Sequence, residues 1–293
     1  MNPIDLNELV DCATTAAPAA AEVICHYSGR EVKVFSKKGG DTLASQVVTE
    51  VDRKAQDAIL EVLRPSIDKY NLALLTEESE DDGSRFEKKY FWCIDPLDGT
   101  LAFSEGENGY AVSIGLVARD GTPLIGVVCD PVNDVLWQSG KGLGVKRNGK
   151  NWETPPRNTH LTFTYDRSFE ARPEFLSVCS ALEEVAKKSG LKGIDAKQFG
   201  GSVMNAIHAL ENSPGCHLKL PKPKEGGGSL WDYAATSAIF NEAGAVVSDV
   251  FGNPLDLNRT DSTFMNHRGV LYATDLDLAG NIKNLKYSHH LQF

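Results

Sequence analysis

The chain has 293 residues, of which 41% are hydrophobic, and its formal net charge is −10. A chain of this length can bury roughly 75% of the surface that its unfolded form exposes, so it needs no disulfide or structural metal to fold. The negative charge argues against a general nucleic-acid binder or a membrane-surface protein, because either would gain from a basic face.

The six cysteines are widely separated, and none of them forms a Cys-x-x-Cys pair. Several lie in apolar segments that are typical of a protein core, which indicates reduced thiols. The N-terminal region has no basic stretch followed by an uninterrupted apolar run, and no apolar run approaches the roughly 20 residues of a membrane span. We therefore expect a soluble, cytoplasmic protein that is not exported.

The first part of the chain predicts a helix, a strand and a loop. Apolar residues at helical spacing predict a helix over residues 4–28, with Pro18 as a point of bending or division. Residues 31–35 alternate as in a strand, and a polar, glycine-containing loop follows them. Whether residues 37–46 form a lid that closes over a site is left open by the sequence.

A second helix is predicted from Thr49 to Leu63, because apolar residues again recur at helical spacing. Pro65 predicts the end of this helix, and Asp52 lies in its first turn. The next apolar run is followed directly by the acidic pair Glu77-Glu78.

Two carboxylates three residues apart, Asp95 and Asp98, follow the apolar, strand-like run that ends at Ile94. Pro96 predicts that the strand stops there, while Gly99 tolerates a positive φ and leaves nearby N–H groups accessible to an anion. Mg²⁺ prefers carboxylate oxygens together with substrate phosphate, and amides at a turn or helix start complement phosphate charge. This segment therefore predicts a joint metal and phosphate site and favours phosphoryl chemistry.

Residues 110–150 predict strands joined by turns, which is typical of an antiparallel meander. The proline-containing stretch after it predicts a connector between an N-terminal half, residues 1–155, and a C-terminal half, residues 156–293. In the second half, strand and helix patterns alternate, which predicts a layered α/β arrangement. The predicted strands are 161–165, 193–199, 215–220, 245–248 and 269–273, and the predicted helices are 173–189, 202–210, 231–243 and 276–285.

Further acidic residues lie at the ends of regular elements, namely Asp52, Glu77, Glu78 and Asp232. An element end allows a scaffold to aim a carboxylate into a cleft without burying it unpaired. Each of them also has an ordinary structural interpretation, because the glutamates belong to an acidic surface stretch and Asp232 can cap a helix.

Together and in this order, the motifs resemble the inositol monophosphatase superfamily of metal-dependent, lithium-sensitive phosphatases over essentially the whole chain. That family is marked by a Glu-Glu pair, an Asp-Pro-(Ile/Leu)-Asp-Gly-Thr segment after a Trp-containing strand, and a Trp-Asp pair before an alanine-rich helix ending in Glu-Ala-Gly-Gly. Here these are Glu77-Glu78, residues 95–100, Trp231-Asp232 and residues 242–245, where Ala245 replaces the second glycine. The resemblance implies an α/β (α+β) fold, the layered α/β/α/β/α sandwich of the inositol monophosphatase and sugar phosphatase type.

The resemblance also implies two Mg²⁺ ions and leaves room for a third, weaker one. Glu77, Asp95 and the Leu97 carbonyl would hold the first ion, and Asp95, Asp98 and Asp232 would hold the second. Paired divalent metals lower the pKa of bound water and stabilise the entering and leaving oxygens during in-line displacement. The N-terminal half would therefore carry most of the metal ligands.

The same resemblance places Thr100 and Glu77 beside the attacking water, with Asp52 completing the hydrogen-bond network that helps to deprotonate it. No covalent phosphoenzyme is required, so no side chain is assigned as the nucleophile. The phosphate would lie against the amides of Gly99 and Thr100. The predicted substrate-binding residues are Asp98, Gly99, Thr100, Gly201, Ser202 and Glu225.

The catalytic motifs do not separate the substrates of this superfamily. The segment 95–100 and residues 106–110 are most similar to the 3′(2′),5′-bisphosphate nucleotidase branch, whereas Leu230 stands where that branch commonly has lysine. Glu225 matches the position at which inositol monophosphatases place a glutamate on the substrate's hydroxyls, although beside three glycines it also fits a solvated loop.

The lysines at positions 219, 222 and 224 are either a site for a second phosphate or a solvated face. We therefore expect a Mg²⁺-dependent, lithium-sensitive phosphomonoesterase acting on a small phosphorylated metabolite, either 3′-phosphoadenosine 5′-phosphate or inositol monophosphate. Fructose 1,6-bisphosphate and histidinol phosphate are alternative substrates, and a family member whose main role is protein binding is an alternative function. No nucleic-acid or membrane partner is expected, and the sequence leaves open whether the chain forms a homodimer.

Overall fold

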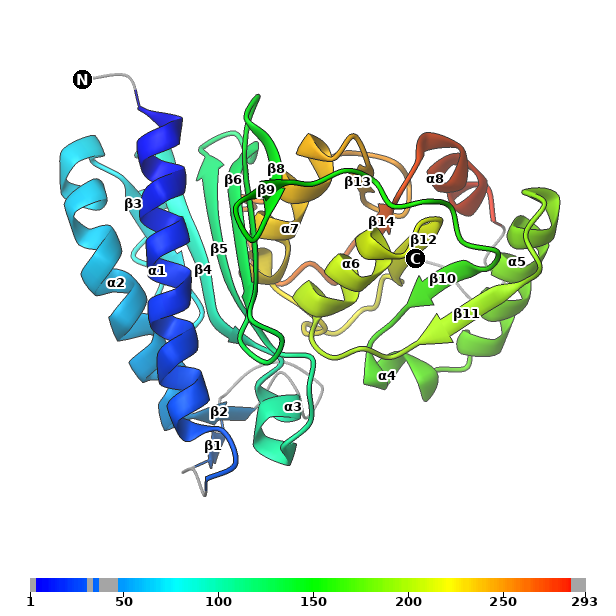
Figure 1. Ribbon diagram of the computed structural model, residues 1–293, viewed down its shortest axis with the longest axis horizontal. Coiled ribbons are helices and arrows are strands. Elements are labelled where there is room, and N and C mark those ends of the chain that lie inside the picture. The colour runs from blue at the N-terminus through cyan, green and yellow to red at the C-terminus, as the bar shows by residue number, and fades with distance from the viewer. Residues whose placement is uncertain (1–3, 31–33, 37–46, 286–293) are drawn as a thin grey trace.

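The predicted meander forms the strands from β5 onward in a seven-stranded sheet with the order β3-β4-β5-β6-β7-β8-β9. The computed structural model describes residues 4–30, 34–36 and 47–285, and Figure 1 shows how the elements are layered. Strands β3 and β4 pair in parallel, and the other neighbours in this sheet are antiparallel. The strands are β3 (Ala73–Thr76), β4 (Tyr90–Asp98), β5 (Ala111–Ala118), β6 (Pro123–Asp130), β7 (Val135–Gly140), β8 (Gly144–Arg147) and β9 (Lys150–Asn151).

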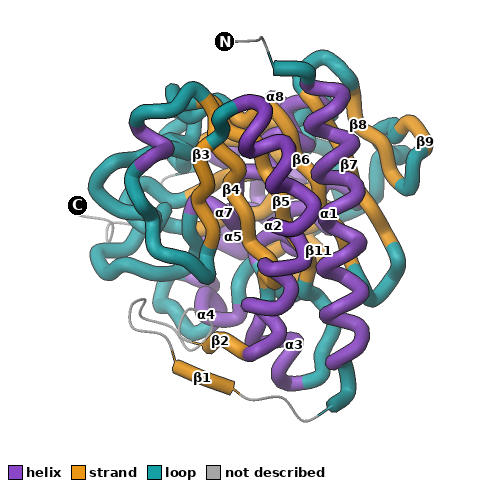
Figure 2. Tube along the Cα trace, turned by 90° about the vertical axis from the view of Figure 1, so that its left-hand side faces the viewer, coloured by secondary structure: helices purple, strands orange, loops and turns teal. Residues whose placement is uncertain are grey.

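Two long helices, α1 (Leu6–Tyr27) and α2 (Glu50–Tyr70), cover one face of this sheet (Figure 2). Their buried apolar residues recur at helical spacing and share one core with the sheet: Leu9, Ala13, Ala20, Ile24, Val51, Ala55 and Ile59. Along the chain between them, β1 (Val34–Ser36) pairs with β2 (Val47–Thr49) as an antiparallel ribbon.

The prediction that Pro65 ends the second helix is wrong, because α2 continues to Tyr70. Pro65 lies on the exposed side of the helix, where water can bond to the carbonyl that lacks its usual N–H partner. The buried side continues beyond it with Ser66 and Tyr70, and burial of that side outweighs the local cost of the proline. Pro18 likewise lies inside α1 without dividing it.

The second sheet has five strands in the order β11-β10-β12-β14-β13. Strand β10 is parallel to both of its neighbours, and the remaining pairs are antiparallel. The strands are β10 (Leu161–Thr164), β11 (Ile194–Lys197), β12 (Gly215–Lys219), β13 (Val246–Ser248) and β14 (Val270–Ala273). Each lies within a segment that the sequence predicts to be a strand.

Helices α6 (Ser202–Glu211) and α7 (Leu230–Glu242) fill the space between the two sheets (Figure 1). On the far side of the second sheet lie α4 (Arg167–Glu170), α5 (Phe175–Lys188) and α8 (Leu276–Lys283). Three apolar clusters correspond to these interfaces between layers. The fold is therefore the layered α/β/α/β/α sandwich that the sequence predicts.

Helix α7 lies close to the first sheet because glycines stand beneath it. A Cβ on Gly126 of β6 would lie 2.1 Å from the carbonyl oxygen of Ala235, and one on Gly115 of β5 would lie 2.8 Å from Cβ of Ala234. The small side chains on both sides permit this approach. It brings the first turn of α7 next to β4, which carries the predicted metal-binding segment.

The prediction that Pro96 stops its strand is also wrong, because β4 runs on to Asp98. The pairing with β5 shifts register between Asp95 and Asp98, so the strand bulges around the proline. A bulge leaves a residue outside the ladder, which suits a residue without an N–H group. Strand β4 then passes through Gly99 into the short helix α3 (Thr100–Glu105).

The first sheet ends at Asn151 and the second begins at Leu161, so the predicted division after residue 155 falls between them. Helix α7 contacts strands of both sheets, and the division into two halves stays a prediction. Residues 37–46, with the question of a lid, and the beginning of the strand predicted over 31–35 lie outside the described residues. None of the helices in the described part has the length and apolar character that crossing a membrane requires.

Candidate active site

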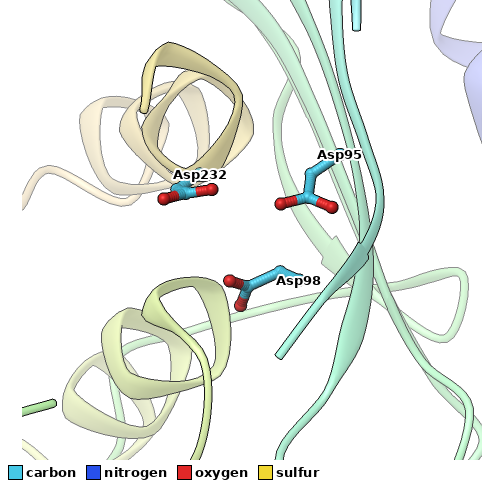
Figure 3. Close-up of side chains that lie close together, drawn as sticks. All are labelled: Asp95, Asp98 and Asp232. Carbon is cyan, nitrogen blue, oxygen red and sulfur yellow. The ribbon is translucent and has the colours of Figure 1, made fainter. Parts of the chain in front are cut away.

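Asp95, Asp98 and Asp232 converge between β4 and the start of α7 (Figure 3). Each offers one carboxylate oxygen, and these three oxygens lie within 4.8 Å of one another. The residues are 2%, 7% and 8% exposed, respectively, so all three carboxylates are buried. The fold thus joins the two aspartates of one short segment to the predicted third ligand from the other half of the chain.

The position of Asp232 is fixed by the cap of α7. Ser229 and Asp232 form a capping box, in which the N–H of Ser229 donates to Oδ2 of Asp232 at 2.9 Å. The carbonyl of Trp231 accepts a hydrogen bond from the Ser113 hydroxyl of β5 at 3.2 Å. Asp232 therefore caps its helix and also takes part in the cluster, since a carboxylate has two oxygens.

Asp98 lies at the N-terminus of α6. The amides of Ser202 and Val203 donate to its two carboxylate oxygens at 3.2 and 2.8 Å. These N–H groups have no acceptor within the helix, so the carboxylate satisfies them and complements the positive end of the helix. A Cβ on Gly201 would lie 2.2 Å from Oδ2 of Asp98, which is why only glycine fits there.

A chain of hydrogen bonds connects Asp95 to the first turn of α2. Oδ1 of Asp95 accepts from the Leu97 amide at 3.0 Å, and the Thr100 hydroxyl lies 3.0 Å from the Leu97 carbonyl and 2.9 Å from Oδ1 of Asp52. The other oxygen of Asp52 accepts from the amide and hydroxyl of Thr49 at 2.8 and 2.6 Å. The Thr100 hydroxyl is therefore held between Asp52 and the segment that carries the first two aspartates.

The remaining predicted residues lie outside the cluster of three aspartates. Glu77 follows β3, and its charge helps to raise the pKa of Asp95, although within the described residues it is not part of the 4.8 Å cluster. Gly99, with φ of 86°, caps α3, and the amide of Gly201 donates to the Gly109 carbonyl at 2.8 Å. Glu225 is exposed and accepts a hydrogen bond from the Ser262 hydroxyl at 2.7 Å.

Burial raises the pKa of all three aspartates. At Asp95 the charges of Glu77, Asp232 and Asp98 raise it further, whereas at Asp232 the charge of Lys219 opposes the shift. Three buried carboxylates that repel one another are a donor set that a divalent cation would neutralise. With carboxylate oxygens and a nearby backbone carbonyl, the site fits the ligands that Mg²⁺ prefers.

Sequence reasoning missed Asp166, which forms an ion pair with Lys219 at 2.7 Å. The available signal is its place two residues after the end of β10, since side chains at the carboxyl ends of parallel strands commonly line a site. The three lysines predicted as a unit are separated in the structure: Lys219 is buried among protein acceptors, and Lys224 is exposed.

Comparison with known proteins assigns a family to this fold and site. A model of the inositol monophosphatase family matches residues 5–283. The curated relative "Inositol-1-monophosphatase" from Synechocystis sp. is 31% identical, over 88% of this chain and 84% of its own length. "Nus factor SuhB" from Haemophilus influenzae is 26% identical, over 83% of this chain and 86% of its own length.

Solved structures share the fold. The inositol monophosphatase from Anabaena aligns with a TM-score of 0.71 at 24% identity, over 96% of this chain and 95% of its own. The extragenic suppressor protein suhB from Bartonella henselae aligns with a TM-score of 0.72 at 23% identity, over 94% of this chain and 99% of its own.

Proposed function

Because the chain belongs to the inositol monophosphatase family, we propose that it is a metal-dependent phosphomonoesterase whose site is centred on Asp95, Asp98 and Asp232. The observation that carries the proposal is the convergence of these three buried carboxylates from β4 and α7. A cluster of like charges is costly to bury without a cation, so its burial favours a metal site over a chance grouping.

In the proposed site, Glu77, Asp95 and the Leu97 carbonyl would hold one Mg²⁺ ion, and Asp95, Asp98 and Asp232 would hold a second, as the family resemblance implies. Bound Mg²⁺ supplies positive charge for the phosphate and lowers the pKa of water. We further propose that Li⁺ inhibits the enzyme by occupying one of these positions.

The chain's own groups orient the attacking water. The Thr100 hydroxyl donates its proton to Asp52 or to the Leu97 carbonyl, which leaves its oxygen free to accept a hydrogen bond from the water. The same contacts fix the position of the hydroxyl oxygen, and Glu77 serves as the acceptor of the water's proton. The amides of Gly99 and Thr100 bind the phosphate.

Inositol monophosphate is the substrate that we rank first. The ammonium of Lys219 is already hydrogen-bonded to protein groups, which weakens the case for a second phosphate there. The name of the relative from Synechocystis agrees with this ranking. The bisphosphate 3′-phosphoadenosine 5′-phosphate stays the second candidate, with Lys222 and Lys224 as its remaining basic residues.

A panel of phosphate esters tests this proposal. Phosphate release with Mg²⁺ would be compared for inositol 1-phosphate, 3′-phosphoadenosine 5′-phosphate, fructose 1,6-bisphosphate and histidinol phosphate, with kcat/KM as the measured quantity. We expect the highest value for inositol 1-phosphate and none without a divalent metal. Preference for the bisphosphate nucleotide would reverse the ranking of substrates, and no release from any ester would contradict the proposed activity.

A protein-binding role is the second candidate, because several curated relatives carry the name Nus factor SuhB. Metal binding separates the two candidates. An enzyme that binds Mg²⁺ only when folded gains about 2.7 kcal/mol of stability when the metal concentration is 100 times Kd. We therefore expect saturating Mg²⁺ to raise the Tm of the metal-stripped protein by several degrees, whereas an unchanged Tm would favour a binding role without catalysis.

Replacing Gly201 with alanine tests the geometry of the site. The new Cβ would collide with the Asp98 carboxylate, so we expect Gly201→Ala to lower kcat/KM by about tenfold or more, equivalent to about 1.4 kcal/mol. Gly280→Ala is the matched control, since a Cβ there, inside α8, meets nothing within 4 Å. The two variants would be assayed for phosphate release, and equal activity would contradict the packing of Gly201 against Asp98.

A further inference from the structure

A largely buried lysine, Lys219, lies beside the three aspartates with all of its hydrogen-bond donors in use. Nζ of Lys219, at the end of β12, lies 2.7 Å from Oδ2 of Asp166, 2.6 Å from the Ser202 hydroxyl and 2.7 Å from the Gly227 carbonyl oxygen. An ammonium group has three N–H bonds, so these three acceptors satisfy it completely. The side chain is only 12% exposed.

The three acceptors belong to three different elements. Asp166 follows β10, Ser202 opens α6, and Gly227 lies in the loop that leads into α7. The amide of Ser202 donates to Asp98, and the loop ends at Ser229, whose amide donates to Asp232. Lys219 thus contacts both of the segments that position two of the three clustered carboxylates.

The loop before α7 packs closely against Tyr233 and Asp232. The Gly227 carbonyl also accepts from the Tyr233 hydroxyl at 3.1 Å. A Cβ on Gly228 would lie 1.9 Å from that hydroxyl oxygen and 2.9 Å from Oδ2 of Asp232. Because the loop packs directly on the carboxylate, a displacement of Gly227 would be transmitted to Asp232.

The charge of Lys219 is balanced locally. Burial alone would lower the pKa of Lys219, but nearby negative charges, that of Asp166 first among them, raise it. The ammonium therefore stays charged, and its ion pair with Asp166 adds no net charge beside the aspartates. Lys219 therefore contributes to the site mainly through where its hydrogen bonds hold the neighbouring segments, and less through net charge.

We propose that Lys219 is a positioning residue whose three hydrogen bonds hold α6 and the loop before α7, so that Asp98 and Asp232 stand ready to bind a divalent cation. The inference rests on the proposed function, because it assigns a role at that same site. It predicts that loss of the lysine weakens metal binding even when the net charge is conserved.

The test measures Mn²⁺ binding to the metal-stripped protein by isothermal titration calorimetry. The double variant Lys219→Met with Asp166→Asn removes both charges, so the net charge is conserved while the hydrogen bonds are lost. Changes to groups that orient metal ligands typically weaken metal binding by about 10- to 100-fold, and we expect a loss in this range. Lys187→Met, on the exposed surface of α5, controls for the loss of a lysine and should bind Mn²⁺ as the wild type does.

A Kd within twofold of wild type in the folded double variant would overturn the inference, even if its Tm were lower, since a merely structural role changes stability alone. If the double variant does not fold, Ser202→Ala decides, because it removes one of the three acceptors and leaves the ion pair intact. Weaker Mn²⁺ binding by Ser202→Ala supports the inference, and unchanged binding overturns it. If the wild type itself binds no Mn²⁺, the proposed function fails first and the inference fails with it.

Discussion

Asp95→Asn is expected to lower kcat for phosphate release by about a thousandfold or more, a loss of roughly 4 kcal/mol of transition-state stabilisation. Asp95 is the aspartate assigned to both metal ions, and its carboxylate lies within 4.8 Å of those of Asp98 and Asp232. The neutral amide keeps the shape of the side chain but removes the charge that attracts the cations. The same variant is expected to lose the rise in Tm that Mg²⁺ gives the wild type.

The fold should survive this substitution. Burial and the neighbouring carboxylates raise the pKa of Asp95, so its ionised form destabilises the metal-free fold, and asparagine removes that cost. Asp130→Asn is the matched control, because Asp130 is also buried but serves a turn after β6, where it accepts from the Val132 amide at 2.9 Å. Steady-state assays and thermal unfolding of both variants are the measurements, and an Asp95→Asn enzyme within a few-fold of wild-type kcat would refute the site assignment.

Thr100→Ala is expected to lower kcat by about 100-fold, the lower end of what positioned proton transfer contributes, while KM changes little. The variant removes the hydroxyl that lies between Asp52 and the Leu97 carbonyl, so the attacking water loses the group that orients it. Metal binding should persist, because Thr100 is not assigned as a metal ligand.

Thr100→Ser provides the conservative comparison, since it restores the hydroxyl without the methyl group. We expect it to recover most of the activity that Thr100→Ala loses. Equal activity of wild type and Thr100→Ala, or a Thr100→Ser enzyme as slow as the alanine variant, would show that the hydroxyl has no part in orienting the water. The separate values of kcat and KM for the three enzymes decide between these outcomes.

Most of the layered fold could be predicted because its elements have clear periodicity and its motifs resemble a known family. The two wrong boundaries both involve proline. Pro65 lies on an exposed helix face and Pro96 lies at a bulge, and in each place tertiary structure removes the need for the missing N–H. Local sequence does not report whether tertiary packing carries a helix past a proline on its exposed face, or where the partner strand shifts register.

The site, like the fold, has parts that the sequence predicts and parts that it could not predict. Asp95 and Asp98 are close in sequence, whereas Asp232 could be joined to them only through the family resemblance. The fold brings the three carboxylates together. The ion pair between Lys219 and Asp166 could not be predicted, because it depends on how two strands of the second sheet lie beside each other. Glu225 stays a prediction, since its exposed position on the loop before α7 does not by itself assign it to substrate.

The most direct test of a metal centre at Asp95, Asp98 and Asp232 is anomalous diffraction from crystals grown with Mn²⁺ at a concentration that supports phosphate release. We expect anomalous peaks within the cluster, with Asp95 bound to two ions. Active crystals without a peak among these three carboxylates would contradict this expectation.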